Sequence, residues 1–245
     1  MRRILVPLLA CAMLLGACRG GTGVRLAPTP EPITQPANLS AFRYTLAAEA
    51  SNLAGAPAAV PGGTPTPITV RVSGEVAAAD RQRSHLSLNL GFGVLESDRV
   101  QIGDRTWTRD GIAPWVEERT VPDAAATRAL GLGLDPAVLV GAAAQDRLKA
   151  ALKGGTATTE HANGIDVARY TLTAAQVRTL LGTREGSQAA SLAGGTDAWS
   201  FWVTKDRWLP VRLLADAPTE QGGHIRVDLA LTDHNVPGIA VEPPK

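Results

Sequence analysis

The sequence predicts an α+β fold in which an antiparallel β-sheet packs helices on one of its faces. Most segments after residue 40 alternate apolar and polar side chains with a period of two, which is typical of half-buried strands. Two segments in the middle of the chain change to a helical period, and short turns between most strands indicate hairpins. We expect about ten strands and two helices in one domain, from about residue 40 to residue 245.

The strands are expected in two groups, one on each side of the first helical segment. The first group covers residues 42–46, 68–77, 84–90, 94–102 and 105–108, with Trp115 after a short loop. The second group covers residues 156–161, 165–172, 199–204, 208–215 and 224–232. Asn163-Gly164 is the strongest hairpin signal in the chain, because an Asn-Gly pair adopts the left-handed conformations that a two-residue turn requires.

The two helices are predicted from their end signals. Asp135-Pro136 supplies an N-cap and a proline at the first helical position, which predicts one helix that runs to the Gly154-Gly155 pair. Thr173 and Gln176 have the spacing of a capping box, so a second helix is expected from there to Gly182.

The first eighteen residues have the arrangement of a bacterial lipoprotein signal. Arg2-Arg3 is a short positive region, and residues 4–15 are an apolar run that is too short to span a bilayer. Gly16-Ala17-Cys18 then forms a lipobox, in which the cysteine sulfur receives a diacylglycerol before cleavage makes it the new N-terminus. The alternative is an ordinary signal peptide with an accidental cysteine. We expect residues 1–17 to be a signal peptide that is removed.

Residues 18–39 are expected to be the acylated Cys18 and a proline-rich tether. Four prolines without apolar periodicity predict an extended spacer, and acyl chains on Cys18 predict a lipid anchor in the outer leaflet of the cell membrane. In an organism with two membranes, the outer membrane is a second possible location. Cys11 would leave with the signal, so we expect no intramolecular disulfide and no thiolate zinc site.

Charge and motifs argue against several function classes. The formal net charge is +1, from 24 Lys and Arg against 23 Asp and Glu, and this balance is unlike that of a nucleic-acid binder. The chain contains no nucleophile elbow, P-loop, zinc-protease or dinucleotide-binding motif. The four histidines are scattered, which favours ordinary polar roles over metal binding. We therefore expect a protein that is not an enzyme and needs neither a cofactor nor a metal.

Several short segments resemble the LppX/LprA/LprF/LprG-type lipoproteins, within the broader LolA/LolB-like group of lipid and lipoprotein carriers. They are the lipobox at Cys18, residues 102–107 with Trp115, Leu134-Asp135-Pro136, Asn163-Gly164-Ile165 with Arg169-Tyr170, and residues 202–212. In the last of these, Thr204 stands where an aspartate is more usual. The resemblance covers about residues 42–243. It implies a half-barrel, which is a curved antiparallel sheet whose concave face is covered by helices, with an apolar cavity for the acyl chains of a lipid or glycolipid.

The walls of such a cavity would be helix residues that face the sheet and strand residues of one parity. The expected residues are Val138, Leu139, Leu148, Leu152, Val177, Leu180 and Leu181 from the helices, and Leu86, Leu88, Leu90, Phe201 and Val203 from the strands. Alanines at 142–144 and 150–151 would leave room for a ligand, or would equally allow close helix–sheet packing. The alternative function is an envelope protein-interaction or sensor module with a filled core and no ligand.

Overall fold

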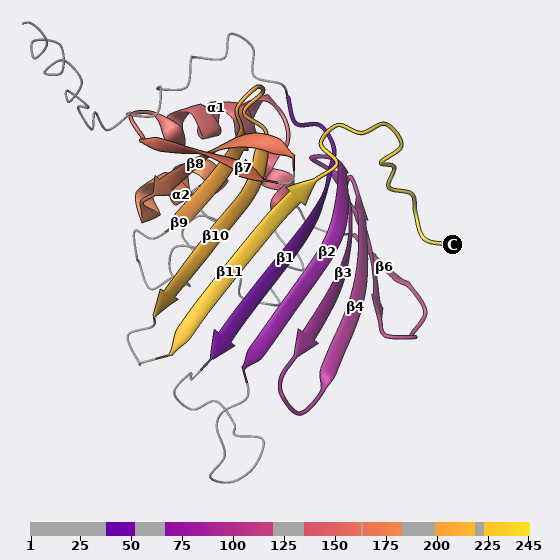
Figure 1. The fold of residues 1–245 in the computed structure, drawn as a ribbon. Helices are drawn as coiled ribbons and strands as arrows, with labels where there is room; N and C mark the ends of the chain where they lie inside the picture. The colour runs from indigo at the N-terminus through magenta and orange to yellow at the C-terminus, as the bar shows by residue number, and fades with distance from the viewer. Residues whose placement is uncertain (1–37, 52–66, 120–134, 163, 183–198, 219–222) are drawn as a thin grey trace, which may run out of the picture.

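The computed structural model describes residues 38–51, 67–119, 135–162, 164–182, 199–218 and 223–245. These residues form one eleven-stranded antiparallel sheet with two α-helices and a short 3-10 helix (Figure 1). The strand order is β6-β5-β4-β3-β2-β1-β11-β10-β9-β8-β7, and the edge strands β6 and β7 do not pair with each other, so the sheet is open. The predicted antiparallel sheet with two helices is therefore confirmed.

Successive hairpins build each half of the sheet. The first half contains β1 (Phe42–Ser51), β2 (Ile68–Ala78), β3 (Arg81–Asn89), β4 (Val94–Ile102), β5 (Arg105–Asp110) and β6 (Val116–Arg119). The second half contains β7 (Ala157–Ala162), β8 (Ile165–Leu172), β9 (Trp199–Thr204), β10 (Pro210–Pro218) and β11 (His224–Thr232). The hairpin predicted at residues 163–164 is confirmed by the pairing of β7 with β8. Strand β6 was not predicted.

The two halves join where the first and last strands pair in the middle of the sheet (Figure 1). The register of β1 with β11 runs from Arg43 opposite Thr232 to Ser51 opposite His224. Residues from opposite ends of the domain therefore form its central ladder.

The first helical segment is interrupted, so the prediction of one continuous helix is wrong. The 3-10 helix η2 (Pro136–Leu139) begins at Asp135, whose carboxylate accepts a hydrogen bond from the Ala137 amide at 2.9 Å. Gly141 then has a φ of 89°, which lies outside the helical region, and α1 (Ala142–Leu152) starts after it. Glycine has no Cβ and adopts a positive φ without a steric clash, so the chain can change direction at Gly141.

The second helix, α2 (Ala174–Leu181), follows the prediction. The Thr173 hydroxyl accepts a hydrogen bond from the backbone amide of Gln176, and the Gln176 side-chain oxygen accepts one from the backbone amide of Thr173. The capping box is therefore confirmed. Gly182, with a φ of 90°, ends the helix.

Alternation along the strands gives the sheet two different faces. We call the face that carries Phe42, Tyr44 and Leu46 of β1 the inner face, and the opposite one the outer face. Inner-face side chains and the three helical segments share one hydrophobic cluster, which we call the inner cluster. Its strand members include Phe42, Tyr44, Leu46, Val70, Val72, Tyr170, Leu172, Trp199, Phe201, Val203, Leu213, Val227, Leu229 and Leu231.

A second, small cluster lies on the outer face. Val100 of β4 and Trp107 of β5 pair across the two strands and pack with Val241 of the C-terminal segment. Val241 is buried, so the chain after β11 returns to the first half of the sheet and covers part of its outer face. These contacts account for the apolar residues Val100 and Ile102 of β4.

Candidate functional site

Eleven of the twelve predicted wall residues meet at the inner cluster. Leu139, Leu148, Leu152, Val177, Leu180, Leu181, Phe201 and Val203 are buried members of it, and Leu86, Leu88 and Val138 are partly buried and pack against it. Leu90 is the exception, because β3 ends at Asn89 and Leu90 lies in the following turn. The lipidation residue Cys18 lies outside the described residues.

Polar contacts join the helical segments above this cluster. The guanidinium of Arg147 in α1 donates one hydrogen bond to the Val138 carbonyl of η2 and another, of 3.3 Å, to the Leu180 carbonyl of α2. The Gln176 side-chain amide of α2 donates to the Ala151 carbonyl of α1 at 2.9 Å. Carbonyls near the ends of helices lack partners within the helix, so these contacts satisfy acceptors while connecting neighbouring segments.

The inner cluster continues into an apolar patch that is only partly covered. Leu86, Leu88 and Val138 are half-buried at its margin. Leu95 lies opposite Leu88 on β4 and is 60% exposed. We call these four residues the inner patch. Apolar surface therefore extends from the buried cluster out to solvent on the β3–β4 side of the sheet.

The inner face also has a polar row beside this patch. The strand registers place Tyr44, Gly74, Ser84 and Arg99 opposite one another on β1 to β4. A Cβ on Gly74 would lie 2.7 Å from the Tyr44 hydroxyl oxygen, so the ring needs a glycine beneath it to cross β2. The ring crosses β2 towards Ser84, and burial of the hydroxyl raises the pKa of Tyr44. Tyr44 thus remains a neutral phenol at physiological pH.

Arg99 is the one cation among the buried polar residues within the described part of the chain. The side chain is 7% exposed, and its Nη2 atom donates to the Gln101 side-chain oxygen at 3.2 Å. Its Nε atom is buried without a hydrogen-bond partner. Burial lowers the pKa of Arg99, while the carboxylates of Asp135 and Glu118 oppose that shift.

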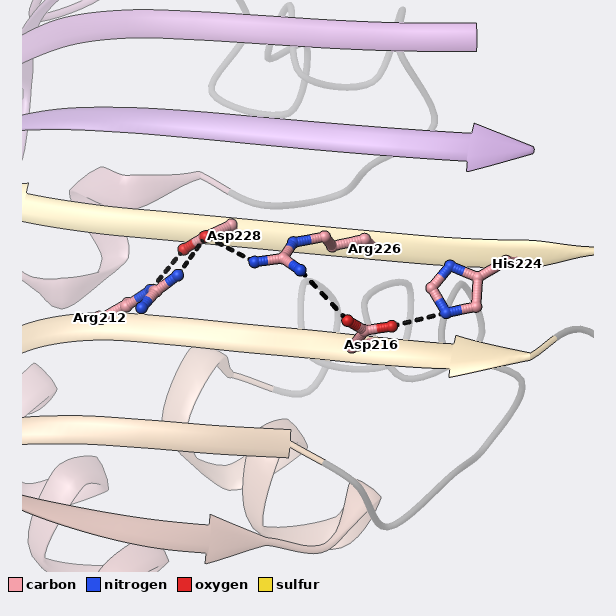
Figure 2. A network of polar contacts seen from close by, with 5 residues as sticks. All are labelled: Arg212, Asp216, His224, Arg226 and Asp228. Atoms are coloured by element: carbon pink, nitrogen blue, oxygen red, sulfur yellow. Dashed lines mark hydrogen bonds and ion pairs between the residues drawn. The ribbon is translucent and has the colours of Figure 1, made fainter. Parts of the chain in front are cut away.

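Several charges on the outer face are, by contrast, paired with one another. Figure 2 shows a ladder between β10 and β11 that runs from Arg212 through Asp228, Arg226 and Asp216 to His224. The Arg212 guanidinium also lies over the Trp202 ring, 5.3 Å from its centroid. The Arg212–Asp228 pair is bidentate and partly buried, and a network of this kind stabilises a fold more than isolated exposed ion pairs do.

Two open pockets lie away from the predicted walls. One, of about 430 Å³, surrounds Gly74 and is lined mainly by outer-face charges such as Arg43, Glu75 and Asp98. The other, of about 550 Å³, lies at the β9–β10 turn beside Lys205 and His234. None of the twelve predicted wall residues lines either pocket.

The structure also bears on membranes and metals. No helix in the described segments is both long and apolar enough to cross a membrane. In the same segments, no three His, Cys, Asp or Glu side chains come together as possible metal ligands.

No protein-family model and no curated protein matches this chain. The resemblance to lipid-carrier lipoproteins therefore depends on the short sequence segments described above.

Sequence reasoning missed Arg99 because β4 has apolar residues of both parities. Val100 and Ile102 pack in the outer cluster, whereas Leu95 and Arg99 lie on the inner face. The useful signal was the short connection between β3 and β4. A hairpin that pairs Asn89 with Val94 brings Ser84 opposite Arg99 and places both on the inner face.

Proposed function

We propose that this protein is a membrane-anchored lipoprotein that carries a lipid or glycolipid at the cell envelope. In this proposal acyl chains on Cys18 hold it at the membrane, and the sheet is a half-barrel whose concave inner face the helices cover. The observation that carries the proposal is the continuity between the inner cluster and the inner patch. An acyl chain that contacts Leu88 and Leu95 would find further apolar side chains towards Val138, where η2 packs against the cluster.

Entry of an acyl chain requires the helical segments to move from the sheet. Val177, Leu180 and Val203 have no exposed surface, so the helices and β9 now fill the space between them with their own side chains. The extended Val140 and the left-handed Gly141 separate η2 from α1, which gives the segment over β2 a hinge. A ligand would replace the contacts between side chains with contacts to its own methylenes. Each CH₂ of the ligand that is buried would stabilise the complex by about 0.8 kcal/mol.

The second candidate function is an envelope protein-interaction or sensor module without a ligand. The complete burial of Val177, Leu180 and Val203 is the observation in its favour, since a filled core needs no occupant. The carrier function requires η2 to move away from the sheet, whereas the interaction module does not.

Val138→Trp distinguishes the two functions. The full chain carrying Cys18→Ser would be incubated with vesicles of phosphatidylglycerol and phosphatidylcholine, separated from them and extracted for mass spectrometry. Because Val138 is half-buried at the margin of the cluster, we expect its replacement to reduce lipid uptake about tenfold, or about 1.4 kcal/mol. Thermal unfolding should change little.

The matched control is Val177→Trp in the fully buried part of α2. Overpacking there should lower stability by about 1–3 kcal/mol. The carrier function is wrong if the wild-type chain takes up no lipid, or if Val138→Trp destabilises the fold as much as Val177→Trp does.

A further inference from the structure

The inner face contains a buried cation whose hydrogen-bonding capacity is not fully used within the described part of the chain. Arg99 is 7% exposed, makes no ion pair within the described segments, and leaves its Nε atom without an acceptor. Its hydrogen bond goes to the amide oxygen of Gln101, which also accepts one from Gln82 at 3.1 Å. Buried guanidinium groups are usually paired with a carboxylate. The Arg99 guanidinium instead donates to a neutral amide oxygen, which it shares with Gln82.

The nearest acidic groups do not provide that pairing. The Asp135 carboxylate acts on Arg99 through space, but no ion pair joins them, and one of its oxygens accepts the hydrogen bond from the Ala137 amide. Glu118, two strands away from Arg99, also acts only at a distance. Tyr44 and Ser84, which lie in the same row, are neutral hydrogen-bonding groups. An anion that binds Arg99 would therefore meet the guanidinium and the two neutral hydroxyls, with the carboxylates of Asp135 and Glu118 acting from farther away.

Arg99 lies on the same strand and the same face as Leu95 of the inner patch. Leu95, Ser97, Arg99 and Gln101 are successive inner-face positions of β4, opposite Leu88, Leu86, Ser84 and Gln82 of β3. The Cα atoms of Leu95 and Arg99 are thus about 13 Å apart along one strand, at about 3.3 Å per residue. Apolar side chains occupy one end of this strand pair and polar side chains the other, which is the distribution of an amphiphilic molecule.

We propose that Arg99 binds the anionic group, a phosphate or carboxylate, of an amphiphile whose acyl chain lies on the inner patch. This inference rests on the proposed carrier function and specifies its ligand as an anionic lipid. The guanidinium would form a charge-assisted hydrogen bond from Nε, with the Tyr44 hydroxyl and the Ser84 side chain as neighbouring donors.

The test compares lipid uptake from two kinds of vesicle. The full chain carrying Cys18→Ser is offered phosphatidylglycerol vesicles or phosphatidylcholine vesicles, with and without inorganic phosphate, and bound lipid is measured by mass spectrometry. We expect about tenfold more phosphatidylglycerol than phosphatidylcholine to be bound, and we expect Arg99→Gln to abolish this preference. Arg71→Gln, an exposed arginine on the outer face of β2, is the control that should keep it.

Thermal unfolding separates loss of binding from loss of fold. Because Arg99→Gln removes an unpaired buried charge, its melting temperature should equal or exceed that of the wild type.

Equal uptake of the two lipids by the wild type would overturn the anionic site and leave the carrier function standing. No uptake of either lipid would overturn the carrier function. A phosphate-dependent rise in melting temperature that Arg99→Gln removes would then assign the site to a free anion. A lower melting temperature for Arg99→Gln, with the lipid preference intact, would make Arg99 a structural residue.

Discussion

At the residue scale, the turn after β11 shows how single side chains fasten distant segments. Asn235 has a φ of 56° and its side-chain oxygen accepts hydrogen bonds from the Ser40 amide and hydroxyl, at 2.8 and 2.9 Å. Its amide group donates to the Asn38 carbonyl at 2.9 Å. Asparagine tolerates the left-handed conformation, so Asn235 can form this turn while its side chain bonds the segment before β1.

His234, in the same turn, predicts a pH dependence of stability. Its Nε2 atom lies 2.7 Å from the Pro210 carbonyl oxygen, to which a neutral ring donates. Burial lowers the pKa of His234 below its usual 6.5, although the Pro210 carbonyl and Asp233 oppose the shift. The folded protein therefore holds this proton less tightly than the unfolded chain does. The resulting stability is present above the unfolded pKa and falls as the pH drops below about 6.5.

We expect His234→Asn to flatten the decline in unfolding free energy between about pH 7 and about pH 5. Urea unfolding across that range measures the slope, with His85→Asn as the control because His85 is an exposed residue of β3. An unchanged slope in His234→Asn would show that other groups cause the pH dependence.

At the element scale, the interruption between η2 and α1 makes Arg147 important. The helical segments are short, and isolated helices of this length are marginal, so tertiary contacts must hold them together. Arg147 supplies two of those contacts by donating to the carbonyls of Val138 and Leu180. A single continuous helix would not have needed this connection.

Arg147→Ala should lower the unfolding free energy by about 1–3 kcal/mol, because two carbonyls lose a charged donor. Lys149→Ala, at an exposed position of the same helix, should change it by about 0.5 kcal/mol or less. Chemical denaturation measures both values. Equal effects of the two substitutions would mean that the Arg147 contacts contribute nothing beyond helix propensity.

At the scale of the whole molecule, the pairing of β1 with β11 determines the cooperativity of the fold. Both halves of the sheet meet at this ladder, and the inner cluster spans it with side chains from both strands. Contacts between residues so far apart in the chain are formed late and at a large cost in loop-closure entropy. We therefore expect the domain to fold slowly and as one unit.

The proposed anchor also concerns the whole molecule. Because acyl chains on Cys18 are the attachment we propose, Cys18→Ser should release the protein from membranes into the soluble fraction. Cys11→Ser, which changes a cysteine inside the expected signal segment, is the control and should leave the protein membrane-bound. Fractionation in high salt, followed by immunoblotting, measures the distribution. Membrane association that persists in Cys18→Ser would contradict the proposed anchor.

Local sequence patterns determined the elements of this fold. The period-two alternation placed most strands within a few residues of their observed limits, and the Thr173–Gln176 capping box placed α2. One local prediction failed at Gly141, where the helical stripe continues in the sequence although the backbone leaves the helix. These features depend on neighbouring residues, so a single sequence contains the information for them.

Only the tertiary structure decided the strand order, the register and the character of the inner face. The pairing of β1 with β11 depends on residues that no local pattern connects. The placement of Arg99 depends on the β3–β4 register, because a shift of one residue would turn its side chain to the outer face. The wall residues could be predicted from parity and helical spacing, whereas the buried cation beside them could not. Its position follows from contacts that form only when the whole sheet has assembled.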